Sequence, residues 1–271
     1  IFSNTTGYDN TANGYQSLYL NTAGVYNTAS GMFALYSNTT GSYNTASGYQ
    51  SLYLNTAGVY NTASGYQSLY ANTTGIDNTA NGMNALYSNT TGNNNTANGY
   101  SALYTNTTGG NNTANGYQSL YLNTSGSYNT ASGMFALYRN TTGNYNTANG
   151  YAALFSNTVG ESNTASGYQS LYSNTTGSYN IANGENALFY NSTGSYNIAS
   201  GRSALFNNTT GYSNVALGYY SGYNSTGFGN VFLGDSAGYL WTGNNALFIG
   251  NATSPNMIHG DFSTGNFGIG T

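Results

Sequence analysis

The sequence predicts an all-β fold, a parallel β-solenoid (β-roll) of 17-residue coils. A glycine opens each coil at 17-residue intervals, from Gly14 and Gly31 through to Gly218. Short alternations of apolar and polar residues are broken by Gly and Asn, and no run has the period of an amphipathic helix. Such repeats are typical of stacked units that bury their apolar faces only against their neighbours.

One coil, residues 14–30, reads GYQSLYLNTAGVYNTAS and contains the expected elements. We predict two short strands per coil, roughly YQSLY and NTASG, with turns at Asn and Gly because both tolerate left-handed dihedrals. The Thr of NTASG becomes Ile181, Ile198 and Val215 in later coils. This exchange for β-branched apolar residues predicts that the position faces inward.

Each of these coils also carries a Leu followed by Tyr or Phe. Adjacent residues of a strand point to opposite faces, whereas a coil this thin has one interior. We therefore expect one column to fill the coil and the other to pack between chains, since an uncovered stack would leave a large apolar patch. The expected core or interchain ladder comprises Leu18, Leu35, Leu52, Leu69, Leu86, Tyr19, Tyr36 and Tyr53.

Composition excludes several classes of function. Charged residues make up 3% of the chain, the net charge is -4, and Arg139 and Arg202 are the only basic residues apart from one His. We therefore expect no nucleic-acid partner. No stretch reaches the roughly 20 apolar residues of a membrane span, so we expect no membrane insertion. Cysteine is absent, which excludes disulfides and thiolate metal sites.

No catalytic or metal-binding pattern emerges, so we expect no enzyme activity, no cofactor and no metal. His259 is the only histidine and is expected to be structural. Asp9 and Asp77 occupy the same place in coils four repeats apart, too far to act on one substrate. The Asp-bearing nonapeptide of calcium-binding β-rolls does not occur.

After Gly218 the glycine spacing shortens to 16 residues. The motifs NVALG (214–218), NVFLG (230–234) and ALFIG (246–250) resemble the head repeats of trimeric autotransporter adhesins. That resemblance implies a left-handed parallel β-roll assembled as a homotrimer. The repeat NTASGYQSLYSNTTG and the final stretch SPNMIHGDFSTGNFGIGT resemble phage tail fibres and related bacterial surface fibres, in which such a stretch precedes an intramolecular chaperone.

These observations divide the chain into three expected parts. Residues 1–218 form the solenoid shaft, 219–250 the adhesin-head-like repeats, and 251–271 a transition toward a C-terminal region outside this sequence. We expect Trp241 and Phe248 to mark a distinct subdomain or cap. The predicted function is the structural shaft of an extracellular, cell-surface or virion fibre that displays a receptor-binding tip, with further copies of the chain as its partners.

An alternative is direct binding of a host-surface glycan or receptor along the repeat. The candidate contacts are Tyr26, Tyr43, Tyr60, Tyr128 and Tyr145, since repetition turns weak sites into avidity. Ice binding is a weaker alternative, because at least one column of Thr is expected to point inward. The Asn-Thr-Thr sites, such as Asn38, Asn72 and Asn89, are formal acceptors for N-glycosylation.

Overall fold

The computed structural model describes residues 2–251 and 258–269, in two compact units, Ile1–Thr142 and Gly143–Thr271. Each unit is a parallel β-solenoid. Together they hold about 14 coils with a 17-residue repeat, and no helix occurs among the described residues. The predicted all-β solenoid is therefore confirmed, whereas its assembly state stays a prediction.

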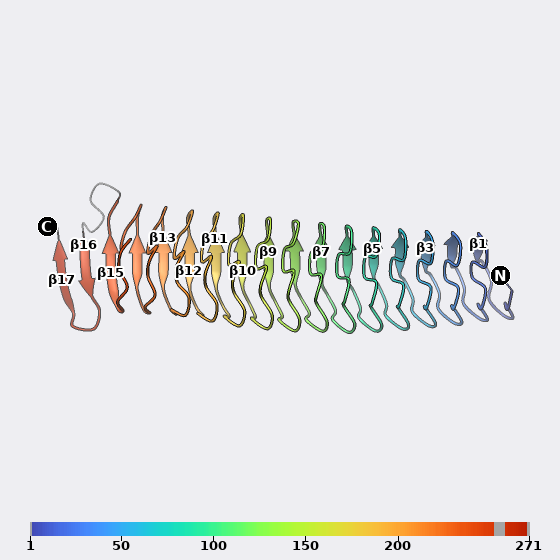
Figure 1. Cartoon of the computed structure of the whole chain (residues 1–271). Helices are drawn as coiled ribbons and strands as arrows, with labels where there is room; N and C mark the ends of the chain where they lie inside the picture. Colours follow the sequence, from blue (N-terminus) through green and yellow to red (C-terminus); the bar gives the residue numbers. More distant parts are fainter. Residues whose placement is uncertain (1, 252–257, 270–271) are drawn as a thin grey trace. The chain divides into compact units, whose positions relative to one another are not determined.

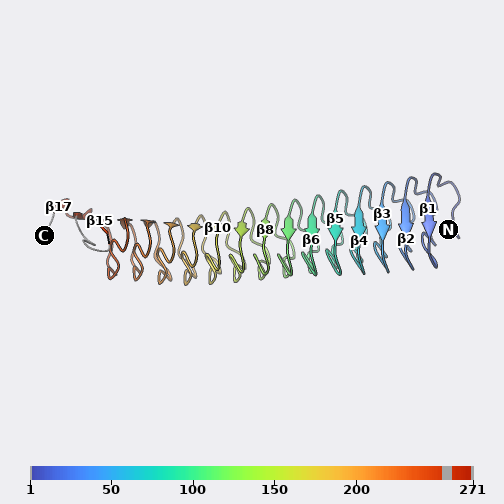
Figure 2. The same cartoon turned by 90° about the horizontal axis from the view of Figure 1, so that it is seen from above.

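Each coil contributes one short strand to a sheet whose strands follow one another side by side within each unit (Figures 1 and 2). The first unit holds β1 (Thr11–Asn13), β2 (Thr28–Ser30), β3 (Thr45–Ser47), β4 (Thr62–Ser64), β5 (Thr79–Asn81), β6 (Thr96–Asn98), β7 (Thr113–Asn115) and β8 (Thr130–Ser132). The second holds β9 (Thr147–Asn149), β10 (Thr164–Ser166), β11 (Ile181–Asn183), β12 (Ile198–Ser200), β13 (Val215–Leu217), β14 (Val231–Leu233), β15 (Ala246–Ile249), β16 (Ile258–Asp261) and β17 (Asn266–Ile269). Parallel neighbours pair in register, for example Thr28 with Thr45, so identical side chains stack in columns.

The prediction of a second strand at YQSLY is wrong. In every 17-residue coil the Leu of this segment has φ between 49° and 52°, and the residue two places before it is also left-handed. Such dihedrals curve the chain, so this side of the coil is an arc of turns. The arc still bonds from coil to coil, since Leu35 N donates to Ser51 O at 3.0 Å.

The interior is filled by two columns, the leucine column and the inner alanine column. The five predicted residues Leu18, Leu35, Leu52, Leu69 and Leu86 are fully buried. Ala29 and its equivalents in the middle of β3–β13 are buried opposite them. The predicted inward direction of the preceding Thr is wrong, because Ile181 and Ile198 in that column are exposed. Strand residues alternate between the two faces, so burying the Ala turns both of its neighbours outward.

Two buried asparagine ladders line the rest of the interior. In the first, Asn38 Nδ2 donates to Asn21 Oδ1 at 2.7 Å and to Gly41 O at 2.9 Å. In the second, Asn44 donates its backbone N–H to Asn27 Oδ1 at 3.0 Å. Asn27 Nδ2 donates to Gly41 O at 2.8 Å, so the carbonyl of one glycine joins both ladders. These asparagines do not supply left-handed turns as predicted; they form buried ladders instead.

Glycine is required for two different reasons. The opening glycines have φ between 129° and 137° in all 17-residue coils, a region that side chains disfavour. Gly41 has no such dihedral, but a Cβ there would collide with Asn38 Oδ1 and lie 2.7 Å from Asn55 Nδ2. Glycine therefore recurs at the place of Gly41 in each coil because the next coil approaches too closely for a side chain.

The core is exchanged where the coil shortens to 16 residues. Gly222 and Gly238 replace the leucine, while Phe232 and Phe248 replace the alanine. A Cβ on Gly222 would lie 2.6 Å from the ring of Phe232, so the ring occupies the space of the missing side chain. The two rings stack with centroids 5.7 Å apart. A large residue thus moves from the arc to the strand.

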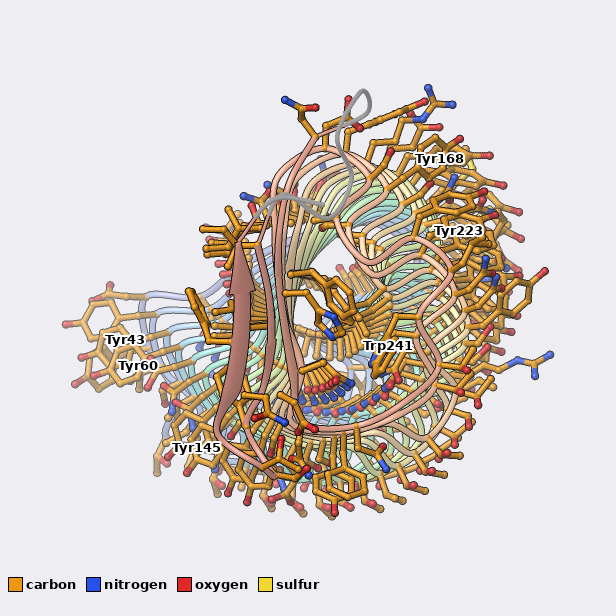
Figure 3. All side chains as sticks on the ribbon, turned by 90° about the vertical axis from the view of Figure 1, so that its left-hand side faces the viewer. Tyr43, Tyr60, Tyr145, Tyr168, Tyr223 and Trp241 are labelled. Atoms are coloured by element: carbon orange, nitrogen blue, oxygen red, sulfur yellow. The ribbon has the colours of Figure 1, made fainter. Side chains whose placement is uncertain are left out.

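Trp241 lies in the second 16-residue coil, between Gly238 and Phe248, and antiparallel strands follow that coil. The expectation that Trp241 and Phe248 mark a distinct subdomain or cap stays a prediction. Trp241 lies within the outline of the last coil in Figure 3, and its indole N–H donates to Asn230 Oδ1 at 3.2 Å. Asn230 is the last described asparagine of the second ladder, because Ala246 takes that place in the next coil. β16 then pairs antiparallel with β15, and β17 with β16. The parallel order ends there.

Candidate interaction faces

The largest outward feature is a stack of aromatic rings on the arc, called here the aromatic ladder. Neighbouring rings lie nearly parallel with centroids 5.0–5.3 Å apart in the first unit. Its members there are Phe2, Tyr19, Tyr36, Tyr53, Tyr70, Tyr87, Tyr104, Tyr121 and Tyr138. They are half-buried except for Phe2 at the end, so the predicted Tyr19, Tyr36 and Tyr53 lie outside the coil while the leucines lie inside.

A second column borders the ladder, at the residue after each opening glycine. It holds mostly exposed Tyr and Met, for example Tyr66, Met83 and Tyr100. Figure 3 shows Tyr168 of this column and Tyr223 of the ladder pointing outward on the same side of the second unit. The two columns together form what we call the aromatic face. Its extent and apolar character match surfaces that are covered in an assembly.

The predicted glycan contacts occupy a separate corner of the coil. Tyr26, Tyr43 and Tyr60 are brought together, with centroids 5.0 Å apart; Figure 3 shows Tyr43 and Tyr60 pointing outward. Tyr128 lies in the same column of the first unit, beyond Asp77, Asn94 and Asn111, and Tyr145 belongs to the second unit. The five are 44–60% exposed.

Two further members of this corner column, Tyr179 and Tyr196, stack at 5.0 Å in the second unit. They occupy the same place in the repeat as the five predicted tyrosines, so a complete reading of that column identifies them from sequence. All seven have left-handed backbones with φ between 56° and 60°. The coil-to-coil bond from Tyr43 N to Val25 O, 3.0 Å, helps hold this conformation.

The Asn-Thr-Thr acceptors are inaccessible in the folded coil. Asn38, Asn72 and Asn89 belong to the first asparagine ladder and are fully buried. Asn72 Nδ2, the atom that would carry a sugar, donates to Asn55 Oδ1 at 2.8 Å and to Gly75 O at 3.1 Å. A glycan would replace one of the two donated hydrogens and has no room at a fully buried nitrogen, so the folded repeat is not an acceptor at these sites.

Charged side chains are too scattered to form a reactive cluster. Within residues 2–251 and 258–269, no group of three His, Asp or Glu is placed to hold a metal ion. Arg202 Nε lies 3.5 Å from Glu185 Oε2 of the preceding coil, and both side chains are about half exposed. His259 stacks on Phe248 at 4.5 Å. Ser263 and Thr264 donate hydrogen bonds to Asp261, which lowers the pKa of its carboxyl.

The aromatic ladder shifts the ionisation of several of its phenols. Partial burial raises the pKa of Tyr87, and the neighbouring Tyr104 adds to the effect. Burial likewise raises the pKa of Tyr70 and of Tyr121. Ionising one ring of a stack places its charge among close phenols, so the neutral form is favoured in the folded coil.

Alkaline pH is therefore expected to destabilise the solenoid. A pKa raised by folding leaves stability unchanged below the unfolded value of 10.0 and lowers it as pH rises through the folded value. Thermal melts should be level up to about pH 10 and decline above it. Tyr87→Phe should reduce that decline without changing the melt at pH 7, because Phe155 and Phe189 show that the ladder accepts Phe. Equal declines in both proteins would contradict the assignment.

Within the described part of the chain, no helix is both long and apolar enough to cross a membrane. No protein-family model and no curated protein sequence matches the chain.

Proposed function

We propose that this chain is the structural shaft of an adhesive fibre. The observation that carries the proposal is the continuity of bonding from coil to coil. In the first unit, a buried asparagine, a backbone arc and an in-register strand repeat the same contacts coil after coil. Such a repeat gives stiffness and resistance to proteases, because no coil can open without breaking the ladders on both sides.

We propose further that the shaft is a homotrimer in which the aromatic face packs between chains. The resemblance to trimeric adhesin heads suggests the number of chains, and the exposed Tyr and Met beside the ladder supply apolar area for the contact. Few charges oppose close approach, since Asp9, Asp77 and Arg139 are the only charged side chains of the first unit. The fibre would be extracellular, on a cell or a virion, with receptor specificity at its tip and no cofactor or catalytic role.

Direct glycan binding by the corner tyrosines is the second candidate, favoured by their exposure. Sugars stack on ring faces, but Tyr43 has Tyr26 on one side and Tyr60 on the other at 5.0 Å. Tyr26 and Tyr8 also form an edge-to-face pair with ring centroids 5.5 Å apart. Stacking therefore covers both faces of Tyr43, which weakens the case for a ligand site in this corner, and the shaft is the better-supported function.

The mass of the purified 28.4 kDa chain in solution tests the shaft assembly. We expect light scattering to give about three times that mass. Tyr66→Glu combined with Tyr100→Glu should reduce it to one chain with the fold intact, because Glu185 shows that this column accepts Glu. Val59→Glu combined with Asn93→Glu is the control, in a column that carries Glu161 and lies outside the aromatic face. A monomeric parent protein would contradict the trimer.

Attachment assays separate the two candidates. Changing Tyr26, Tyr43 and Tyr60 together to Ser should leave binding to host cells or glycans unchanged if the chain is a shaft. Loss of binding in a variant that keeps the mass and circular dichroism of the parent would favour the glycan surface.

A further inference from the structure

The outward face of the short strands is a second regular surface, distinct from the aromatic face. It consists of two columns that flank the inner alanine. The threonine column of the first unit comprises Thr11, Thr28, Thr45, Thr62, Thr79, Thr96, Thr113 and Thr130. The second column, two residues later, comprises Asn13, Ser30, Ser47, Ser64, Asn81, Asn98, Asn115 and Ser132. All of these side chains are exposed or half-buried.

The threonines of this column are exposed or half-buried, and their hydroxyls have no protein partner among the described residues. A matched set elsewhere in the coil behaves differently. Thr39 Oγ1 donates to Thr56 O at 2.9 Å, and Thr73 Oγ1 to Thr90 O at 2.9 Å. The repeat therefore uses one set of threonines to bond coils together and leaves the other set available.

Charged and bulky residues are excluded from this face. Asp9, Asp77 and Arg139 of the first unit lie in other columns, and no aromatic residue occurs in either column of the first-unit strands. Every member is Thr, Ser or Asn, and Asn81, Asn98 and Asn115 bond to each other along the face at 2.9 and 2.8 Å. The result is an even, uncharged surface with a methyl and a hydroxyl at each Thr.

The sheet fixes the spacing of these groups. Parallel strands in register repeat at about 4.8 Å, and residues two apart on one strand lie about 6.7 Å apart. The shorter repeat is close to the oxygen–oxygen repeat of hexagonal ice. We propose that the threonine face of β1–β8 binds the ordered water of an ice surface, with Thr hydroxyls taking the places of lattice water and the methyls filling the gaps between them.

Other occupants fit this face less well. A polysaccharide normally stacks on aromatic rings. This face has none, whereas the aromatic face and the corner column carry them. A second copy of the chain would have to bury the unpartnered hydroxyls, which costs about 1–3 kcal/mol for each one left unsatisfied. Contact with water that stays ordered keeps every hydroxyl bonded. The proposal is independent of the shaft, whose contacts lie on the aromatic face.

The test is the effect of the full 271-residue chain on ice. We expect the chain to inhibit ice recrystallisation and to shape growing crystals. Thr62→Tyr combined with Thr79→Tyr should abolish both effects, since two rings rise above the face in adjacent coils. Ala71→Tyr combined with Ser88→Tyr is the control, because it adds the same rings to a column that accepts Tyr190 and should leave both effects unchanged.

A further double variant separates the hydroxyls from the shape of the face. Thr62→Val combined with Thr79→Val keeps the branched side chain that Val215 and Val231 show to be accepted, so folding should be preserved while the effect on ice weakens. A parent chain without any effect on ice would overturn the proposal, as would equal losses in the Thr→Tyr variant and its control. A fall in mass of the Thr→Tyr variant alone would assign the face to pairing between copies and would also overturn it.

Discussion

Replacement of Asn95 by aspartate is expected to lower the free energy of unfolding by about 3–5 kcal/mol at pH 7, as for other unpaired buried charges. Asn95 is fully buried in the second asparagine ladder. Its Nδ2 donates to Asn78 Oδ1 at 3.1 Å and to Gly109 O at 2.9 Å. Aspartate has the same shape but places an oxygen where these two acceptors converge, so the variant loses two donated bonds and buries a negative charge.

The loss should depend on pH in a defined direction. Burial and the facing oxygens raise the folded-state pKa of the introduced carboxyl above its unfolded value of about 3.9. Stability relative to the parent is therefore highest below that value, where the protonated acid can donate to Gly109 O, and falls as pH rises through the folded pKa. Denaturation of the variant and its parent at acidic and neutral pH measures the difference.

The neighbouring residue provides a matched control. Asn94→Asp introduces the same charge one residue away, at an exposed corner position that carries Asp9 and Asp77 in other coils. It is expected to change stability by less than about 0.5 kcal/mol. Hydrogen exchange should show the coils around Asn95 opening in one variant and not in the other. Equal stability of the two variants would contradict the structural role of the ladder.

The coil and its ladders could be predicted from the sequence, but the path of the chain within a coil could not. The glycine period predicts the stacking, and the unvarying leucine predicts a buried column, since each depends only on the repeat. The arc escapes prediction because Leu35 adopts a left-handed conformation that intrinsic preferences disfavour. The bonds from Leu35 to the next coil and its complete burial stabilise what the isolated residue would avoid.

A one-residue difference in alignment decides which strand residues point into the coil and which point to solvent. The change from Thr to Ile181 suggests an interior position, yet Ile181 is exposed and Ala182 is buried. A one-residue shift exchanges the two faces of a strand, so one ambiguous column reverses the whole prediction. The corrected direction provides the open threonine face. The corner tyrosines, by contrast, are correctly expected at the surface, although their role as glycan contacts stays a prediction.

Replacement of Phe232 by alanine is expected to lower the free energy of unfolding by about 3–5 kcal/mol, the usual range for removing a buried Phe. Phe232 is fully buried, and its ring lies against Gly222 and Gly238. Neither glycine can fill the space that the ring leaves. Phe228→Ala is the control, because that ring lies half-exposed on the outside of the same coil against Tyr212, and it should cost much less.

The exchange of core residues predicts that a second change will rescue the first. Gly222 has φ 58°, near the 49–52° of the leucines that take its place in the longer coils, so Leu at this position would bear the same left-handed backbone cost that those leucines bear. Gly222→Leu alone should destabilise the coil, since its side chain meets the Phe232 ring. Combined with Phe232→Ala it should restore part of the lost stability by refilling the cavity. A double variant whose loss equals the sum of the two single losses would show that the residues do not share one space.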